Sequence, residues 1–149
     1  MPDIEFKDLG YKFKIDYVDF IPSKLREEFK QELSQTDKDL IEYYFNLDST
    51  NRLVYLVSIE EHNIGYCLIH VDETYWNLFE IYIRKEFREL GIGTKLSQII
   101  KNDSSKNKKQ IRTYTLPSDR TAKNFYESNR ITARVLIMEE KRTNSRYKI

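Results

Sequence analysis

Near the N-terminus of the chain lies a stretch in which apolar and charged residues alternate. Across residues 11–18, Phe13, Ile15 and Tyr17 fall on one side, and lysine or aspartate residues fall on the other. A period of two residues is typical of a strand with one face in the core and one face in water. Residues 11–18 are therefore predicted to form such a strand.

The period then changes to that of a helix. A helix is predicted to begin at Ser23, because apolar residues recur after it with helical spacing: Leu25, Phe29 and Leu33. A second helix is predicted to begin where Thr36 is followed by Asp39. The polar side of these helices carries charges of both signs, and such a surface is usually solvated: Lys24, Arg26, Glu27, Glu28, Lys30 and Glu32.

Apolar runs separated by turn residues predict the remaining strands, which are residues 53–59, 64–71, about 77–84, 111–116 and about 134–140. Residues 60–63 are predicted to join two of them as a hairpin. Helical spacing from Ile92 predicts a helix that fades in the polar stretch 101–109, and Asp119 can cap a short helix that runs to Tyr126. This order of elements predicts one mixed α/β domain over residues 1–149.

Composition narrows the function classes. The 149 residues are 40% hydrophobic and 33% charged, which is typical of a folded globular protein. The 25 basic residues nearly balance 24 acidic ones, and no basic stripe is interleaved with aromatics, so no nucleic-acid partner is predicted. Without a long apolar run or a signal-like start, we expect no membrane contact and a cytoplasmic location. The single cysteine, Cys67, excludes an internal disulfide and a zinc cluster, and its apolar neighbours favour a buried thiol.

Two of the four glycines, Gly91 and Gly93, fall within one short turn between a predicted strand and a predicted helix. Glycine lets the backbone approach an anion closely, and the first amides of a helix point at such a ligand. Arg88 adds a positive charge beside them. The turn has neither the Gly-Lys-Ser/Thr ending of a Walker loop nor the first glycine of the dinucleotide fingerprint. It therefore predicts a phosphate cradle, and a glycine-rich loop without a ligand is the alternative.

The pattern Arg88-x-x-Gly91-x-Gly93 resembles the Arg/Gln-x-x-Gly-x-Gly/Ala motif of the GNAT superfamily of N-acetyltransferases. The resemblance implies that the turn binds the pyrophosphate of acetyl-CoA and that the backbone of the preceding strand pairs with the pantetheine arm. The cofactor-binding residues that it implies in this part of the chain are Ile81, Tyr82, Ile83, Arg88, Glu89, Leu90, Gly91, Ile92, Gly93 and Thr94.

A second motif follows downstream. Asp119-x-x-Ala122-x-x-Phe125-Tyr126-Glu127 is similar to the family's Asn-x-x-Ala-x-x-Leu/Phe-Tyr-Glu helix. The resemblance implies that Ala122 and Phe125 pack along the cofactor and that Tyr126 lies near its sulfur. A phenol is protonated at neutral pH, so Tyr126 is the predicted proton donor to the departing thiolate.

The general base is predicted to be Glu80, because many family members use a carboxylate on this strand, sometimes through water. Three residues earlier, where some members carry a glutamate, the chain has Asn77, which takes no proton. A solvated strand residue is the alternative reading of Glu80. The only imidazoles, His62 and His70, are expected to have surface or capping roles.

The chain departs from the family pattern after the second motif. Arg130 and Ile131 replace the usual Gly-Phe, and the stretch up to the apolar run 135–138 leaves room for about one strand where the family fits two. Either a strand is missing, or another chain completes the sheet in a homodimer. The resemblance thus implies a mixed, mostly antiparallel central sheet flanked by helices, with a shortened C-terminal strand region.

The function implied is transfer of acetyl from acetyl-CoA to a primary amine, by direct attack in a ternary complex and without a metal. The acceptor is an amine on a small molecule or a protein, recognised by residues 22–47 and the C-terminal strands. A catalytically weak or inactive CoA-binding or regulatory module is the second reading. The third is an interaction protein whose open sheet edge pairs with another copy. Neither the acceptor nor the acyl length follows from the sequence.

Overall fold

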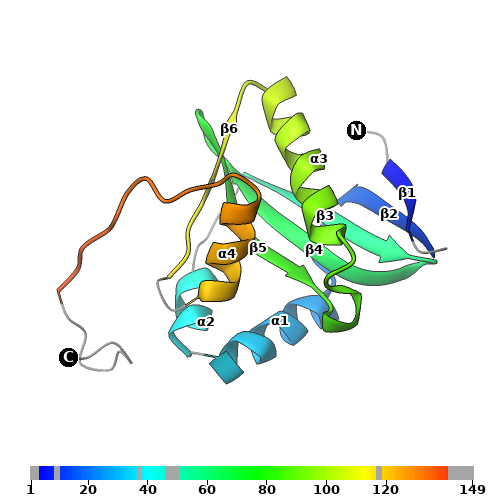
Figure 1. Cartoon of the computed structure of the whole chain (residues 1–149), viewed down its shortest axis with the longest axis horizontal. Helices are drawn as coiled ribbons and strands as arrows, with labels where there is room; N and C mark the ends of the chain where they lie inside the picture. Colours follow the sequence, from blue (N-terminus) through cyan, green and yellow to red (C-terminus); the bar gives the residue numbers. More distant parts are fainter. Residues whose placement is uncertain (1–3, 9–10, 37, 46–50, 117–118, 141–149) are drawn as a thin grey trace.

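The computed structural model describes residues 4–8, 11–36, 38–45, 51–116 and 119–140. Within them, six strands form one sheet in the order β1-β2-β3-β4-β5-β6 (Figure 1). The strands are β1 (Ile4–Asp8), β2 (Tyr11–Val18), β3 (Arg52–Ile59), β4 (His62–Val71), β5 (Tyr75–Ile83) and β6 (Gln110–Thr113). The helices are α1 (Ser23–Thr36), α2 (Lys38–Phe45), α3 (Ile92–Lys106) and α4 (Arg120–Ser128), and a 3-10 turn, η1 (Lys85–Phe87), precedes α3.

The first five strands pair antiparallel, and β6 pairs parallel to β5. A parallel pair needs a crossover connection, which α3 supplies. The mixed, mostly antiparallel sheet that the resemblance implies is therefore confirmed. No helix among the described residues is long and apolar enough to cross a bilayer.

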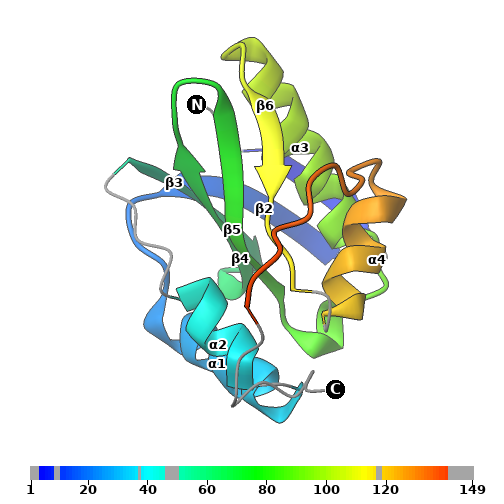
Figure 2. The same ribbon diagram turned by 90° about the vertical axis from the view of Figure 1, so that its left-hand side faces the viewer.

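Helices cover both faces of the sheet (Figure 2). On one face, α3 and α4 bury apolar side chains against the strands, with Leu96 and Ile100 fully enclosed. On the other face, the apolar stripe of α1 packs on Tyr66 and Tyr82, with Leu25 at its centre, and α2 extends this layer. The core is thus divided into two layers by the sheet.

Most predicted elements form close to their expected bounds. The strand over residues 11–18 and the helix starting at Ser23 are confirmed. By contrast, β5 begins two residues earlier than predicted, and β6 ends at Thr113 rather than at residue 116. Strand β1, which the pattern did not predict, has only two apolar positions, Ile4 and Phe6, and owes its conformation to pairing with β2.

The predicted strand at residues 134–140 is wrong for the isolated chain. Residues 131–140 have no regular secondary structure, and no described strand pairs with them. A strand needs a neighbour that accepts its backbone hydrogen bonds. In Figure 1 this segment leads away from the sheet after α4.

Candidate active site

The two parallel strands form a fork. β5 pairs with β6 from Tyr75↔Gln110 to Leu78↔Thr113, where β6 ends. β5 continues to Ile83, and no described strand pairs with this edge beyond Leu78. The fork leaves backbone groups of β5 available to an extended ligand, as an edge strand does for an added strand.

A β-bulge lies where the fork opens. On β4, Leu68 pairs with Glu80 and Ile69 pairs with Leu78, so Phe79 has no partner in the ladder. A bulge bends its strand and redirects side chains, and bulges are over-represented next to active sites. The ring of Phe79 stacks on that of His70, at 5.6 Å between centroids and 11° between planes.

The backbone of the open strand faces the fork at Ile81 and Ile83. The amide of Arg84 donates to Ile64 of β4 at 2.8 Å, and backbone groups alternate in direction along a strand. Ile81 and Ile83 therefore direct their amides and carbonyls away from β4, into the fork. The carbonyl of Ile83 already accepts a hydrogen bond from Arg88 Nε at 2.8 Å.

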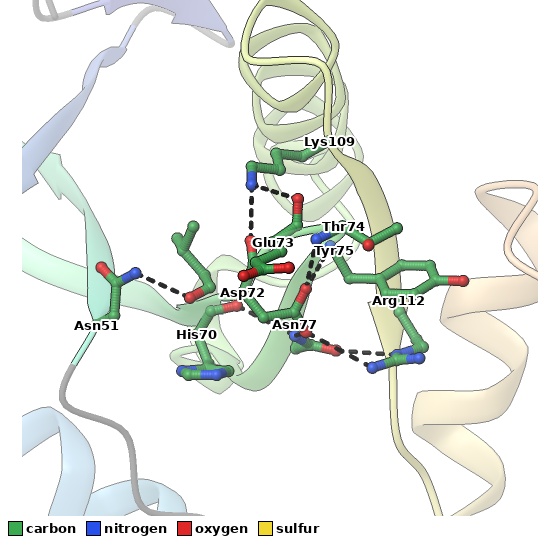
Figure 3. A network of polar contacts seen from close by, with 10 residues as sticks. Asn51, His70, Asp72, Glu73, Thr74, Tyr75, Asn77, Lys109 and Arg112 are labelled. Atoms are coloured by element: carbon green, nitrogen blue, oxygen red, sulfur yellow. Dashed lines mark hydrogen bonds and ion pairs between the residues drawn. The ribbon is translucent and has the colours of Figure 1, made fainter.

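The closed end of the fork is held by a polar network (Figure 3). Asp72 accepts from the amide of Tyr75 at 2.6 Å and from Asn77 Nδ2 at 2.9 Å, and these bonds lower the pKa of Asp72 to about 2. Arg112 Nε of β6 donates to Asn77 Oδ1 at 3.0 Å, and Lys109 donates to the Asp72 carbonyl at 2.7 Å. Buried Asn77 is thus a structural member of this network.

The glycine turn presents a helix start without side-chain caps. Gly91 is the N-cap of α3 with φ 81°, the first turn holds no acidic residue, and Glu89 also has a positive φ of 65°. A Cβ at Gly91 would meet no atom within 4 Å, so the space beside it is open. A Cβ at Gly93 would lie 3.1 Å from Phe125 Cε1, so α4 packs against the turn here. Uncapped amides beside open space fit the diphosphate of a CoA ester.

Arg88 is engaged by a carboxylate on the other layer. Its guanidinium donates to both oxygens of Glu32 on α1, at 2.7 and 2.6 Å. A neighbouring pair joins Arg84 Nε to Glu28, at 2.7 and 3.1 Å. The prediction that the charged face of α1 is only a solvated surface is therefore wrong. Two carboxylates of this face, Glu28 and Glu32, bind the arginines on either side of η1.

Tyr126 lies at the point where the strands part. Its side chain is buried and lies near that of Thr113, whose hydroxyl donates to the Leu78 carbonyl at 3.0 Å. Burial raises the pKa of Tyr126 above its ordinary value, and the neighbouring Thr113 side chain opposes this in part. The phenol is thus held in its protonated form beside the fork.

Glu80 lies on the opposite face of β5, beneath α1. It is 2% exposed, and its two oxygens accept from Arg26 at 3.2 and 2.8 Å. Tyr66 donates to the same carboxylate at 2.7 Å. The sheet therefore separates Glu80 from Tyr126.

The remaining predicted contacts differ in how they face the fork. The Tyr82 side chain stacks on Phe29 of α1, with 5.3 Å between ring centroids, so only its backbone borders the fork. Ile92 is buried in the core, whereas Thr94 is exposed. The other predicted contacts pack partly buried against the core: Leu90, Ala122 and Phe125.

Some residues of this site were not predicted. Arg26, Glu32 and Tyr66 reach it through long-range contacts, for which the sequence carries no local signal. Gly65 is different: a Cβ there would lie 2.6 Å from the Tyr82 carbonyl oxygen. An isolated glycine within a strand pattern is a recognised sign of close backbone approach, and it could have indicated this position.

Two further expectations concern thiol and metal chemistry. Cys67 is buried, as expected, and burial raises the pKa of its thiol. Among the described residues, no three His, Cys, Asp or Glu side chains are grouped so that they could hold a metal ion.

Known structures share this fold at low identity. An aminoglycoside acetyltransferase from an uncultured soil metagenomic sample, crystallised with sisomicin, is 17% identical, with a TM-score of 0.65 over 89% of this chain and 97% of its own. A ribosomal-protein-alanine N-acetyltransferase from Brucella melitensis is 13% identical, with a TM-score of 0.62 over 89% and 99%. An aminoglycoside N-acetyltransferase in complex with CoA is also 13% identical, with a TM-score of 0.57 over 89% and 97%.

A comparison with curated proteins finds no match. The family is shown instead by a match to a family model. Residues 50–129, more than half of the chain, match the family described as the acetyltransferase (GNAT) domain, and this stretch contains the fork, the glycine turn and Tyr126. The chain therefore belongs to the GNAT family of acetyltransferases.

Proposed function

We propose that this acetyltransferase moves acetyl from acetyl-CoA to a primary amine by direct attack within a ternary complex. The observation that carries the proposal is the fork. There the edge of β5 is open beyond Leu78, the start of α3 is uncapped, and the buried Tyr126 phenol lies near Thr113, where β6 ends. When bound, acetyl-CoA supplies the activated thioester.

The cofactor contacts of the proposal divide into three groups. The amides of Gly91, Ile92 and Gly93 hold the pyrophosphate, with Arg88, Glu89, Leu90 and Thr94 around them. The backbone of Ile81, Tyr82 and Ile83 runs along the pantetheine arm. Ala122 and Phe125 pack against the arm from α4. Support comes from the direction of the Ile81 and Ile83 backbone groups and from the uncapped helix start.

In the transfer step, the amine nitrogen bonds to the acetyl carbon and the carbon–sulfur bond breaks. Tyr126 gives its proton to the leaving sulfur, a role supported by its buried, protonated phenol at the fork. Glu80 receives the amine proton through water; its buried carboxylate also accepts hydrogen bonds from Arg26 and Tyr66.

The acceptor is proposed to be an amine of a small molecule or of a protein. The related structures act, by their descriptions, on aminoglycosides and on a ribosomal-protein alanine, so both classes belong in the first screen. Within the predicted acceptor region 22–47, helices α1 and α2 lie on the Glu80 side of the sheet, where the acceptor amine would enter.

The test is a coupled assay of thiol release with acetyl-CoA and a panel of aminoglycosides, polyamines and peptides with free N-termini. For the best acceptor, Tyr126→Phe should lower kcat by about 100-fold or more while CoA affinity stays unchanged. The control is Tyr114→Phe, at the position that follows the end of β6. Unchanged turnover in Tyr126→Phe would remove the proposed proton donor.

A second function is favoured by one observation. Both oxygens of Glu80 are engaged in an ion pair and a tyrosine hydrogen bond, so no described carboxylate on β5 is held ready for proton transfer. A CoA-binding or regulatory module with weak transfer would have this arrangement. Clear CoA binding by calorimetry, with no thiol release across the whole panel, would establish this second function.

A further inference from the structure

Four consecutive apolar side chains stand in solvent after α4. Val135, Leu136, Ile137 and Met138 are 80%, 80%, 70% and 85% exposed. Single exposed apolar residues are ordinary, but an uninterrupted exposed run marks an interaction site. Something other than the described part of this chain therefore covers them in the functional state.

The segment has the pattern of a strand that is buried on both faces. Successive side chains of a strand point to opposite sides, so four apolar residues in a row supply two apolar faces. Arg134 precedes the run, and Glu139 and Glu140 follow it. Such flanking charges bound a strand without interrupting it.

The same chain carries an open sheet edge. β6 pairs with β5 on one side, and no described strand pairs with its other side. An edge strand presents unpaired backbone donors and acceptors, which serve as a template for another strand.

The segment does not reach its own β6 in this structure. The amide of Ile131 donates to the Tyr126 carbonyl at 2.9 Å, and Ile131 packs on the core. Arg130, with φ 63°, makes the turn between them. Beyond Ile131 the chain leads away from the sheet (Figure 1).

We propose that residues 134–140 of one chain pair as a strand with the outer edge of β6 in a second copy, and that the second copy reciprocates. Each chain then provides the strand that the other lacks, which closes a two-fold dimer. The exchange both buries the apolar run and supplies hydrogen-bond partners to the backbone groups along the open edge. Because β6 ends at Thr113, where the fork opens, the added strand would lie beside the fork of the partner.

The first test is sedimentation equilibrium of the full chain. We expect a dimer for the natural sequence and a dissociation constant raised by about 100-fold or more for Ile137→Asp, because a carboxylate in a buried strand is strongly disfavoured. The matched control is Phe20→Asp, since Phe20 is also apolar and 77% exposed but lies outside the segment. A natural chain that stays monomeric at about 1 mM overturns the proposal, as does equal dissociation by both variants.

The second test establishes which strands meet. Chains carrying Gln110→Cys are mixed with chains carrying Ile137→Cys and treated with a short bismaleimide, and we expect cross-linked heterodimers. Phe20→Cys in place of Ile137→Cys should give none above background. If the chain that carries both cysteines, diluted to concentrations at which it is monomeric, cross-links within itself as efficiently, the segment pairs with its own β6, and the proposal fails.

Discussion

Arg88 and Glu32 form a two-pronged ion pair, at 2.7 and 2.6 Å, that ties the glycine turn to helix α1 on the other layer of the protein. The pair is partly exposed, with 34% and 40% of the two side chains accessible. The arginine that the sequence motif assigns to phosphate binding is thus neutralised by a carboxylate in this structure. A pyrophosphate that draws Arg88 toward the turn must compete with Glu32.

This competition predicts that Glu32→Gln raises CoA affinity by about 3-fold or more, because it frees a guanidinium beside an anion site. Arg88→Ala should lower the affinity by about 10-fold through loss of that cation. Calorimetric titration with CoA at low salt measures both changes. Glu28→Gln, which breaks the neighbouring pair with Arg84, is the matched control. Equal affinities in Glu32→Gln and the natural chain would show that Glu32 does not compete with the ligand for Arg88.

A second prediction concerns Gly65, which faces Ile83 across the β4–β5 ladder. A Cβ here would lie 2.6 Å from the Tyr82 carbonyl oxygen, and backbone cannot yield as a flexible side chain does. Gly65→Ala should lower the free energy of unfolding by about 1–3 kcal/mol and weaken CoA binding, since β5 must shift at the fork. Urea unfolding measures the first effect.

The comparison for this prediction is Gly91→Ala, which meets no atom but has φ 81°. It should cost about 1–2 kcal/mol through backbone strain alone. An unchanged unfolding midpoint in Gly65→Ala would contradict the close approach of the two strands.

The local features of the site were predictable because each has a local cause. The start of α3 follows from glycine, which adopts the positive φ that the turn needs. The cap of α4 follows from Asp119, whose carboxylate accepts from the Ala122 amide at 3.1 Å. Both were read from a few neighbouring residues, and both are found where the pattern placed them.

The contacts that join the layers were not predictable in this way. Arg26 and Glu80 are 54 residues apart, and the sequence presents Arg26 only as one charge on a mixed helix face. Which charges of that face meet β5 depends on how α1 crosses the sheet, which periodicity does not specify. The prediction of a strand at residues 134–140 failed for a related reason. An apolar pattern indicates the conformation of a strand but does not specify the neighbouring strand that it needs.

A third prediction separates the structural and chemical roles of Glu80. Arg26→Met leaves the buried carboxylate without its cation and should lower the free energy of unfolding by about 3 kcal/mol. Glu80→Gln keeps hydrogen-bonding capacity and should cost less than that. If Glu80 is the base, Glu80→Gln lowers kcat by about 100-fold or more with little change in CoA affinity. Turnover that only follows the loss of stability would assign Glu80 a positioning role.

The last prediction uses the closed end of the fork, where hydrogen bonds from the Tyr75 amide and from Asn77 lower the pKa of Asp72 to about 2. A carboxyl whose pKa is lower in the folded chain stabilises the fold above its ordinary pKa, near 3.8, and this contribution is lost as the pH falls toward 2. Between pH 7 and pH 3 the urea concentration at the unfolding midpoint should therefore fall further for the natural chain than for Asp72→Asn. Asp19→Asn, an exposed aspartate outside the network, should behave as the natural chain. If Asp72→Asn shows the same loss between pH 7 and pH 3 as the natural chain, the Asp72 network does not fasten β5 to β6.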